Sequence, residues 1–176
     1  ADKIVLSELH NRLLKPATDV GLSYVAGLIE ADGSIFFVHT QSKSHLVAEE
    51  DLSRKRPSVI PKNDERRRPR MTIAMGALEP LKKAQEIMGG GTIERHQKDR
   101  DYTMKALVIA SGNSVLVPLM RLYPYLSSYK RNQALVTVAW VEEHMKHKQK
   151  SPCSPYERHL VDLSRTLNSS PVSRLP

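Results

Sequence analysis

The sequence at residues 24–35 is YVAGLIEADGSI, which combines small, apolar and acidic residues in the manner of a packed helix that ends abruptly. Ser23 predicts the start of this helix, because a serine hydroxyl accepts a hydrogen bond from an amide of the first turn. Gly33 predicts its end, because glycine adopts the left-handed conformation that closes many helices. The Ala26-Gly27 pair is small enough for a second helix to approach closely. We therefore expect a helix that runs to about Glu30 and offers one side for tight packing.

Two carboxylates, those of Glu30 and Asp32, follow at the expected end of this helix. The helix macrodipole is negative there, so carboxylates raise the local negative charge at a cost in free energy unless a cation is bound. Such oxygen ligands suit Mg²⁺, which proteins bind through one or two carboxylates together with phosphate oxygens. An ordinary helix that ends in an Asp-Gly turn explains the same residues. The pattern by itself leaves both interpretations open.

The composition limits the class of protein. The chain has 176 residues, of which 27 are Lys or Arg and 19 are Asp or Glu, so its formal net charge is +8. A hydrophobic content of 40% excludes wholesale disorder. No apolar run approaches the roughly 20 residues of a membrane-spanning helix. Cys153 is the only cysteine, which excludes an intrachain disulfide and a zinc site built from cysteines. We expect a chain stabilised by its apolar core, with no membrane partner.

Most of the positive charge lies in residues 54–70, whose net charge is +6 because only Asp64 and Glu65 oppose eight basic residues. Prolines at positions 57, 61 and 69 disfavour a helix, so we expect a projecting basic loop over residues 51–70. Its composition favours a polyanionic partner, because each neutralised phosphate releases condensed counterions. A solvated loop and a basic localisation signal are the alternatives. The predicted nucleic-acid contacts are Arg54, Lys55, Arg56, Lys62, Arg66, Arg67, Arg68 and Arg70.

Hydrophobic periodicity and turn residues along the rest of the chain predict an α+β fold. The expected order is helix, two strands, helix, two strands and then helices. Four antiparallel strands with helices on one face form two layers, and the uncovered face should be polar. We expect an N-terminal extension over residues 1–22, a core over 23–150, and a linker, C-terminal helix and tail over 151–176.

Residues 25–33, VAGLIEADG, resemble the signature of the LAGLIDADG homing endonucleases, with Val for the first Leu and Glu for the first Asp. The expected order of elements also matches the family core, α-β-β-α-β-β-α with a four-stranded antiparallel sheet. Two further segments are similar to the family: residues 81–93, where a helix closes on Gly-Gly-Gly-Thr-Ile, and residues 122–134, the entry to the third helix. The resemblance extends from Tyr24 to His147, which is most of the chain.

This resemblance implies a homodimer, since a chain with one motif is similar to half of an enzyme. A twofold dimer presents the same surface from both copies, and the resemblance places Tyr24, Ala26, Gly27 and Leu28 in the interface. The predicted partner is double-stranded DNA, with the strands lying in its major grooves.

The resemblance also implies the catalytic residues. Each Asp32 carboxylate and each Ala31 carbonyl would bind Mg²⁺ at the scissile phosphates, where metal ions polarise phosphate oxygens and help to ionise the attacking water. Lys130 matches the basic residue that the family places near the cleaved phosphate, where it offsets negative charge in the transition state. Asp32 and Lys130 are thus the predicted catalytic residues, and Asp32 and Ala31 the predicted metal ligands.

One position departs from the family pattern. Catalytic members carry a polar residue, often Gln, late in the second strand, where Met75 stands in this chain. A thioether is a poor partner for metal-bound water. Two functions are therefore expected: a Mg²⁺-dependent endonuclease that makes a site-specific double-strand cut in DNA, or a cleavage-defective relative that binds structured RNA as an intron maturase or a ribonucleoprotein component. Family members are often encoded in organelles, so the resemblance suggests a chloroplast or mitochondrion.

The remaining candidates favour structural roles. His144 and His147 lie one helical turn apart, but the residues beside them do not complete a metal site, so a solvated helix end is expected. The C-terminal helix is expected to cover the core, and contact with nucleic acid through Arg158 and Arg165 is the alternative.

Overall fold

The computed structural model describes residues 6–14, 18–40, 66–98, 103–147 and 153–169. The strands in these ranges are β1 (Gly33–Thr40), β2 (Arg66–Met75), β3 (Thr92–Lys98) and β4 (Thr103–Ser111). The helices are α1 (Leu6–Leu13), α2 (Val20–Asp32), α3 (Leu78–Met88), α4 (Leu116–Leu122), α5 (Ser128–His144) and α6 (Pro155–Ser169). Two 3₁₀ helices, η2 (Gly112–Val115) and η3 (Tyr123–Tyr125), flank α4.

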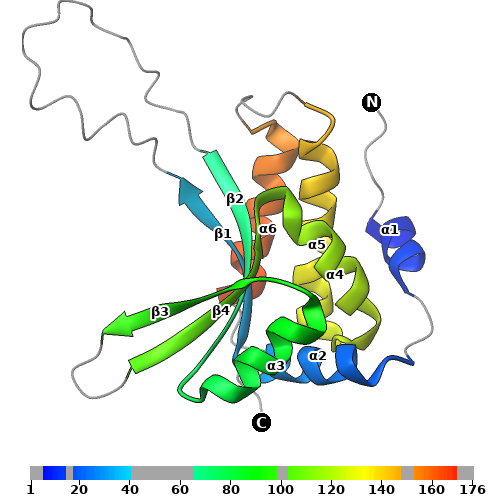
Figure 1. Ribbon diagram of the computed structural model, residues 1–176. Helices are drawn as coiled ribbons and strands as arrows, with labels where there is room; N and C mark the ends of the chain where they lie inside the picture. The colour runs from blue at the N-terminus through cyan, green and yellow to red at the C-terminus, as the bar shows by residue number, and fades with distance from the viewer. Residues whose placement is uncertain (1–5, 15–17, 41–65, 99–102, 148–152, 170–176) are drawn as a thin grey trace, which may run out of the picture.

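The four strands form one antiparallel sheet in the order β1-β2-β4-β3, and the described helices lie on one side of it (Figure 1). This arrangement confirms the α+β class and the order α-β-β-α-β-β-α, with α6 as the C-terminal helix. Side chains alternate between the two faces of a strand. We call the face without helices the open face; its residues are Ser34, Phe36, Arg70, Thr72, Ala74, Glu94, Ala106 and Val108.

The open face is mixed rather than polar as predicted. Phe36 and Val108 are half-buried on it, and Ala106 is buried. The prediction was wrong because strand alternation places these apolar residues on the same face as Ser34, Arg70 and Glu94.

α2 begins at Val20, earlier than the predicted start at Tyr24. The cap is Asp19 rather than Ser23, and its Oδ1 accepts a 2.9 Å hydrogen bond from the amide of Leu22. At the other end α2 passes directly into β1 at Gly33, whose φ is −91° and not left-handed as predicted. Glycine is required there for a different reason: a Cβ atom would lie 2.4 Å from Cα of Ile29.

β2 also begins earlier than predicted, at Arg66 instead of Met71, so the basic loop is shorter than residues 51–70. The Arg66–Arg70 segment pairs with β1, and Pro69 lies opposite Phe37. A proline is tolerated in a strand where its missing N–H has no neighbour to bond. That condition holds because pairing between β2 and β4 starts at Arg70, which lies opposite Ser111.

Other predicted turns are confirmed. Gly89 ends α3 in the left-handed conformation, with φ of 73°. β3 and β4 are consecutive strands and pair antiparallel. Pro118 lies in the first turn of α4, where its missing N–H costs no helical hydrogen bond.

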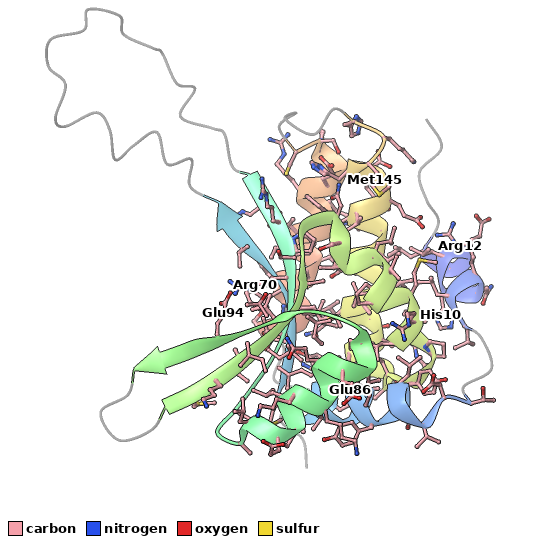
Figure 2. All side chains as sticks on the ribbon, viewed as in Figure 1. His10, Arg12, Arg70, Glu86, Glu94 and Met145 are labelled. Atoms are coloured by element: carbon pink, nitrogen blue, oxygen red, sulfur yellow. The ribbon has the colours of Figure 1, made fainter. Side chains whose placement is uncertain are left out.

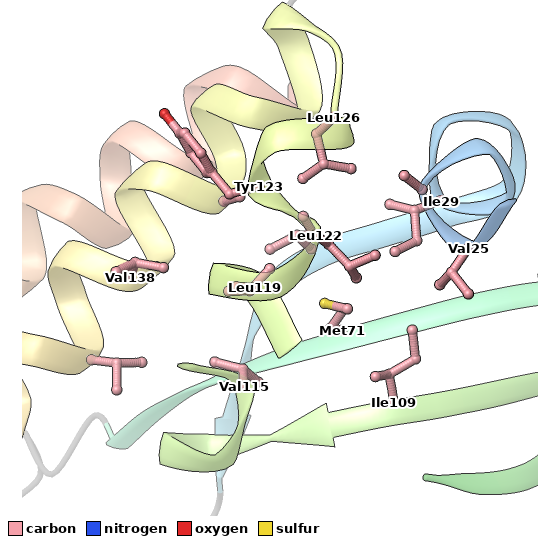
Figure 3. Packing of buried hydrophobic residues seen from close by; sticks show 14 of the residues in the cluster. Val25, Ile29, Met71, Ile109, Val115, Leu119, Leu122, Tyr123, Leu126 and Val138 are labelled. Atoms are coloured by element: carbon pink, nitrogen blue, oxygen red, sulfur yellow. The ribbon is translucent and has the colours of Figure 1, made fainter. Parts of the chain in front are cut away.

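The apolar core fills the space between the sheet and the helices (Figure 3). Met71 and Ile109 project from the sheet toward Ile29 of α2 and Leu122 of α4 (Figure 3), and each of these side chains is at most 7% exposed. Such burial is the main favourable contribution to folding, at about 25 cal/mol per Å² of apolar surface. The core therefore fixes α2 against the sheet and with it the position of the motif.

The N- and C-terminal segments pack onto this core. Leu9 and Leu13 of α1 are buried, and His10 Nδ1 lies 2.6 Å from the hydroxyl of Tyr123. α6 contacts α5 and β1, and the Tyr129 hydroxyl donates a 2.7 Å hydrogen bond to the carbonyl of Leu167. None of the helices in the described ranges is both long and apolar enough to cross a membrane.

Candidate active site and nucleic-acid interface

The structure separates the two carboxylates at the end of α2. Glu30 accepts hydrogen bonds from the amide of Ser127 (2.8 Å) and from its hydroxyl (2.6 Å). Ser127 is the N-cap residue of α5, so Glu30 joins the end of α2 to the start of α5. Asp32 is exposed and makes no hydrogen bond or ion pair with any residue that the structure describes. Asp32 is therefore the carboxylate that remains available to a ligand.

Lys130 reaches the same junction from the first turn of α5. Its Nζ donates a 2.7 Å hydrogen bond to the carbonyl of Gly33, the residue that follows Asp32. Burial lowers the pKa of Lys130, and the nearby Glu30 carboxylate partly opposes that shift. The structure thus brings together the two predicted catalytic residues, one as an exposed carboxylate and one as a half-buried amine.

Met75 lies at the same junction, because Ile73 pairs with Gly33 and β2 ends two residues later. Its side chain is half-buried against the core. The position where the family places a polar group therefore carries a thioether used for packing. The exposed Gly76 that follows it has no side chain with which to bind water.

The residues at this junction suit a divalent cation only in part. Asp32 supplies one free carboxylate, and the last carbonyls of α2, including that of Ala31, lack partners within the helix. In the described ranges, no group of three or more His, Cys, Asp or Glu side chains is arranged to hold a metal. A hard cation here would need further oxygen ligands from a second copy, from phosphate or from water.

α2 has an exposed side made of small residues. Val20 is 84% exposed, Ser23, Gly27 and Ala31 are also exposed, and a Cβ atom added at Gly27 meets no atom within 4 Å. These positions recur at helical spacing and form one stripe, which we call the α2 stripe. A helix that is apolar on several sides ordinarily has all of them covered. The stripe is therefore a surface at which another helix can pack.

The four residues predicted for the dimer interface lie at different positions around α2. Gly27 lies on the α2 stripe, whereas Leu28 and Tyr24 are half-buried, the latter with Lys83 Nζ 4.5 Å from its ring centre. Ala26 is only 1% exposed and belongs to the chain's own core. The prediction for Ala26 needs correction, because the helix turn that exposes Gly27 directs Ala26 toward the sheet.

The eight residues predicted to contact nucleic acid lie in different parts of the chain. Arg54, Lys55, Arg56 and Lys62 lie outside the described residues, and Arg66 begins β2 with a side chain that is not described. Arg68 and Arg70 alternate onto the side of the open face. Arg67 alternates to the other side, where it lines a small hollow with Cys153, Arg158 and Arg165. Arg67 therefore lies away from the open face, and its contact with nucleic acid stays a prediction.

Arg70 is not a free cation on the open face. Its Nη2 forms a 2.8 Å ion pair with Oε2 of Glu94, across β4. Figure 2 shows the two labelled side chains close to one another. Both side chains are partly exposed, so the pair contributes little to stability. The main effect of the pair is electrostatic, because the Glu94 carboxylate on β3 offsets the positive charge of Arg70 on the open face. Period-two alternation in β3 was the signal that would have placed Glu94 on this face.

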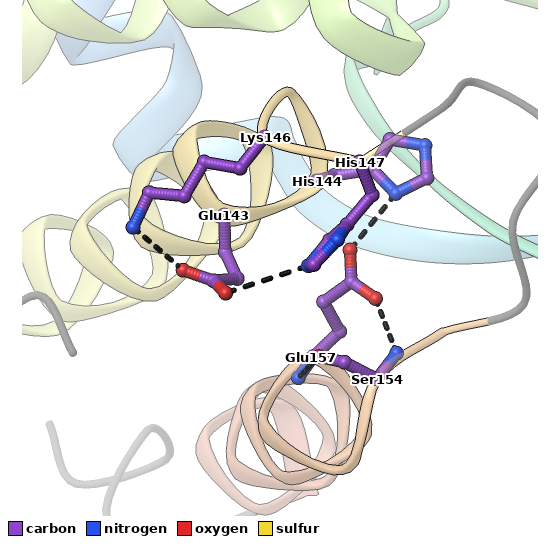
Figure 4. Close-up of polar contacts among 6 residues, drawn as sticks. All are labelled: Glu143, His144, Lys146, His147, Ser154 and Glu157. Atoms are coloured by element: carbon purple, nitrogen blue, oxygen red, sulfur yellow. Dashed lines mark hydrogen bonds and ion pairs between the residues drawn. The ribbon is translucent and has the colours of Figure 1, made fainter. Parts of the chain in front are cut away.

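A second arrangement that sequence reasoning missed lies between α5 and α6 (Figure 4). Glu157 is 1% exposed, accepts hydrogen bonds from His144 Nδ1 (2.9 Å) and from the amide of Ser154, and so caps α6 and holds it to α5. His147 Nε2 lies 3.6 Å from Oε1 of Glu143. The two histidines therefore contact different acids. The expected solvated helix end is wrong for His144, because α6 packs there and its buried Glu157 holds the imidazole. The signal was the capping-box sequence Ser-Pro-Tyr-Glu at 154–157.

Comparison with solved structures gives one consistent result. The chain superposes on I-CvuI in complex with its target DNA with a TM-score of 0.60 at 21% identity, covering 85% of this chain and 82% of that one. I-TnaI gives a TM-score of 0.58 at 10% identity over 89% and 94% of the two chains. I-CeuI complexed with DNA gives 0.54 at 14% identity over 80% and 64%. All three are homing endonucleases, and the predicted motif forms the end of α2.

The chain has the LAGLIDADG homing endonuclease fold. The sequence itself matches no family model and no curated protein. In this chain, Asp32, Lys130 and Met75 lie together at the junction of α2 and β1. I-CvuI was solved with its target in the presence of Ca, and with another target in the presence of Mg with the DNA not cleaved.

Proposed function

We propose that this chain is a homodimeric LAGLIDADG endonuclease that uses Mg²⁺ to make a site-specific double-strand cut in DNA. One observation carries the proposal. At the junction of α2 and β1 the exposed Asp32 carboxylate has no partner within the described chain. Lys130 donates a hydrogen bond to the carbonyl of Gly33, the residue that follows Asp32. Glu30, the neighbouring acid, is already occupied by Ser127.

The α2 stripe supports the homodimer. Twofold packing of one stripe against its copy brings the ends of both α2 helices together, and Gly27 leaves room for close approach. Each copy then contributes one Asp32, and the one or two carboxylates that Mg²⁺ usually takes can come from the two copies together.

The open face supports DNA binding. Arg68 and Arg70 lie on its side of β2; Arg68 supplies a cation to the phosphate backbone, whereas Glu94 offsets the charge of Arg70. Asp32 and the carbonyl of Ala31 would hold Mg²⁺, which when bound polarises a phosphate oxygen and lowers the pKa of an attacking water. Lys130 would place its ammonium near the negative charge that develops on the phosphate.

Met75 favours a second candidate function, a cleavage-defective protein that binds structured RNA. Its side chain packs against the core instead of ordering water at the junction. Binding surfaces on the sheet do not need that water network. In this alternative the same open face binds RNA without hydrolysis.

The test is to incubate the purified protein and Mg²⁺ with a plasmid library that carries candidate intron-insertion sites. Discrete double-strand products that require Mg²⁺ and disappear with Asp32→Asn support the endonuclease. Asp162→Asn is the matched control, because Asp162 is an exposed acid on α6. Salt-sensitive RNA binding by a monomer that does not nick DNA supports the alternative. Cleavage that survives Asp32→Asn contradicts the assignment of the site.

A further inference from the structure

A polar hollow of about 270 Å³ lies where β2 passes η2 and the end of α5. We call it the flank pocket; its lining residues are Arg68, Ser111, Gly112, Asn113, Trp140 and His144. None of them belongs to the candidate active site. The pocket is therefore a second feature that needs a role.

The flank pocket lies at the edge of β2 beyond the end of β4, between that edge and the α5 side chains of Trp140 and His144. Pairing between β2 and β4 stops at Arg70 and Ser111, so β2 runs on toward Arg66 without β4 beside it. Arg68 is two residues from Arg70 on the same strand and so lies on the same side. Arg68 therefore connects the open face to the flank pocket, and a polymer that leaves the open face over the end of β4 would pass this residue.

The charges of the lining favour an anion. Arg68 is exposed and has no ion pair among the described residues, in contrast to Arg70, which Glu94 neutralises. Asn113 presents an exposed side-chain amide that likewise makes no hydrogen bond within the described ranges. No carboxylate is among the lining residues. The lining thus offers a cation and an amide donor, and the Glu157 carboxylate behind it is already bonded to His144 and to the amide of Ser154.

One wall of the pocket is held in a fixed arrangement. The imidazole of His144 stacks on the indole of Trp140, with ring centres 4.5 Å apart and planes 15° from parallel. His144 Nδ1 is held by the buried Glu157 carboxylate, which is itself held by the amide of Ser154. A wall fixed in this way does not have to be ordered when a ligand binds.

We infer that the flank pocket binds a backbone phosphate of the DNA that lies on the open face, just beyond the end of β4. The guanidinium of Arg68 and the amide of Asn113 donate to its non-bridging oxygens, as such groups commonly do at DNA backbones. The inference rests on the proposed function in requiring DNA on the open face. A backbone contact of this kind adds affinity irrespective of sequence and positions the duplex on the sheet.

The experiment uses Trp140, the only tryptophan in the chain, as a reporter inside the pocket. A short duplex of mixed sequence is titrated into the full-length protein, while DNA anisotropy follows binding and tryptophan emission follows the pocket. We expect duplex binding to change the emission of Trp140. Arg68→Gln should weaken binding roughly tenfold and lower the salt slope by about 0.9, the value for one phosphate contact.

Two variants distinguish the pocket from the sheet. Asn113→Ala should weaken binding about threefold or more, and the Arg68→Gln/Asn113→Ala double variant should bind almost as well as Arg68→Gln alone, because both side chains hold one phosphate. Arg121→Gln is the control and should leave the affinity and the salt slope unchanged, since Arg121 is an exposed arginine on α4 that does not line the flank pocket.

Separate results contradict the inference and the proposed function. A duplex that binds with unchanged Trp140 emission, or with the wild-type salt slope in Arg68→Gln, overturns the flank pocket alone. Emission that responds to inorganic phosphate and not to the duplex also overturns it, since the pocket would then take a free anion. A protein that binds no duplex at all contradicts the proposed function itself.

Discussion

The ammonium of Lys130 is fixed to the carbonyl of Gly33 by a 2.7 Å hydrogen bond. The contact joins the first turn of α5 to the first residue of β1, directly after Asp32. A flexible lysine is thereby held at one place without an ion pair to Asp32, so the carboxylate stays available. The relationship explains how two residues 98 positions apart, Asp32 and Lys130, come to lie at the same junction.

Lys130→Met keeps the aliphatic stem and removes the charge. We expect the cleavage rate to fall by about 10²–10³-fold, the loss found when one preorganised electrostatic group is removed from an active site. DNA affinity should change little, because Lys130 is half-buried and is not on the open face. Single-turnover cleavage and anisotropy titrations separate the two effects. A fall in affinity with an unchanged rate would contradict the catalytic role.

The pKa of Lys130 also predicts a pH dependence of stability. Burial lowers this pKa below its usual value of 10.5, so the folded chain holds the proton less tightly than the unfolded chain. Between the lowered value and the usual one, the unfolded state binds more protons, and the free energy of unfolding rises with pH. The Lys130→Met variant has no amine at this position, so its free energy of unfolding should not show this increase with pH. Urea unfolding at several alkaline pH values should therefore show wild type gaining stability relative to the variant.

Glu30 is predicted to stabilise the fold and Asp32 is not. Glu30→Ala removes both hydrogen bonds to Ser127 and should lower the free energy of unfolding by about 1–2 kcal/mol. Ser127→Ala removes only the hydroxyl donor and should cost about half as much. Asp32→Asn, the control, should unfold at the wild-type urea concentration. Equal losses for Glu30→Ala and Asp32→Asn would contradict the division of roles.

The α2 stripe predicts a substitution that separates association from folding. Gly27→Glu adds a side chain where no atom lies within 4 Å, so the single chain should fold normally. A charge on each of two facing helices should abolish the dimer by repulsion and desolvation. Sedimentation at several concentrations measures the change. Asn11→Glu, at an exposed position of α1, controls for added charge; a monomeric wild type would contradict the proposed assembly.

Breaking the pair of Arg70 and Glu94 should strengthen DNA binding. Glu94→Gln frees the Arg70 guanidinium and removes a negative charge from the open face. We expect a steeper salt dependence and severalfold tighter binding at low salt, with stability changed by less than about 1 kcal/mol. Glu79→Gln breaks an exposed pair with Lys82 on α3 and is the matched control. An equal gain in both variants would indicate a general charge effect.

Much of the fold could be predicted from the sequence, because the signals were local. The glycine after α3, the hairpin and the motif helix each depend on residues close together in the chain. The start of β2 at Arg66 could not be predicted in this way. A strand containing Pro69 is tolerated only because β4 ends opposite Arg70, a fact set by tertiary pairing.

The residues of the candidate site could be predicted from the sequence, but the side chains that each of them contacts could not. Asp32 and Lys130 could be named from the motif, whereas the occupation of Glu30 by Ser127 depends on a contact between residues 97 positions apart. Arg67, Arg68 and Arg70 look equivalent in a basic segment. Strand alternation and one acid on β3 divide them into three environments.

Glu157 gives the clearest stability prediction, because its carboxylate is 1% exposed. His144→Ala leaves this carboxylate with the amide of Ser154 and without its imidazole partner, so it should cost about 3 kcal/mol or more. The double variant His144→Ala/Glu157→Leu should cost less than the sum of the single changes, since it leaves no buried charge. Urea unfolding of the four proteins gives the coupling. Additive losses would show that the two side chains do not act as a pair, and the fixed wall of the flank pocket would then need another explanation.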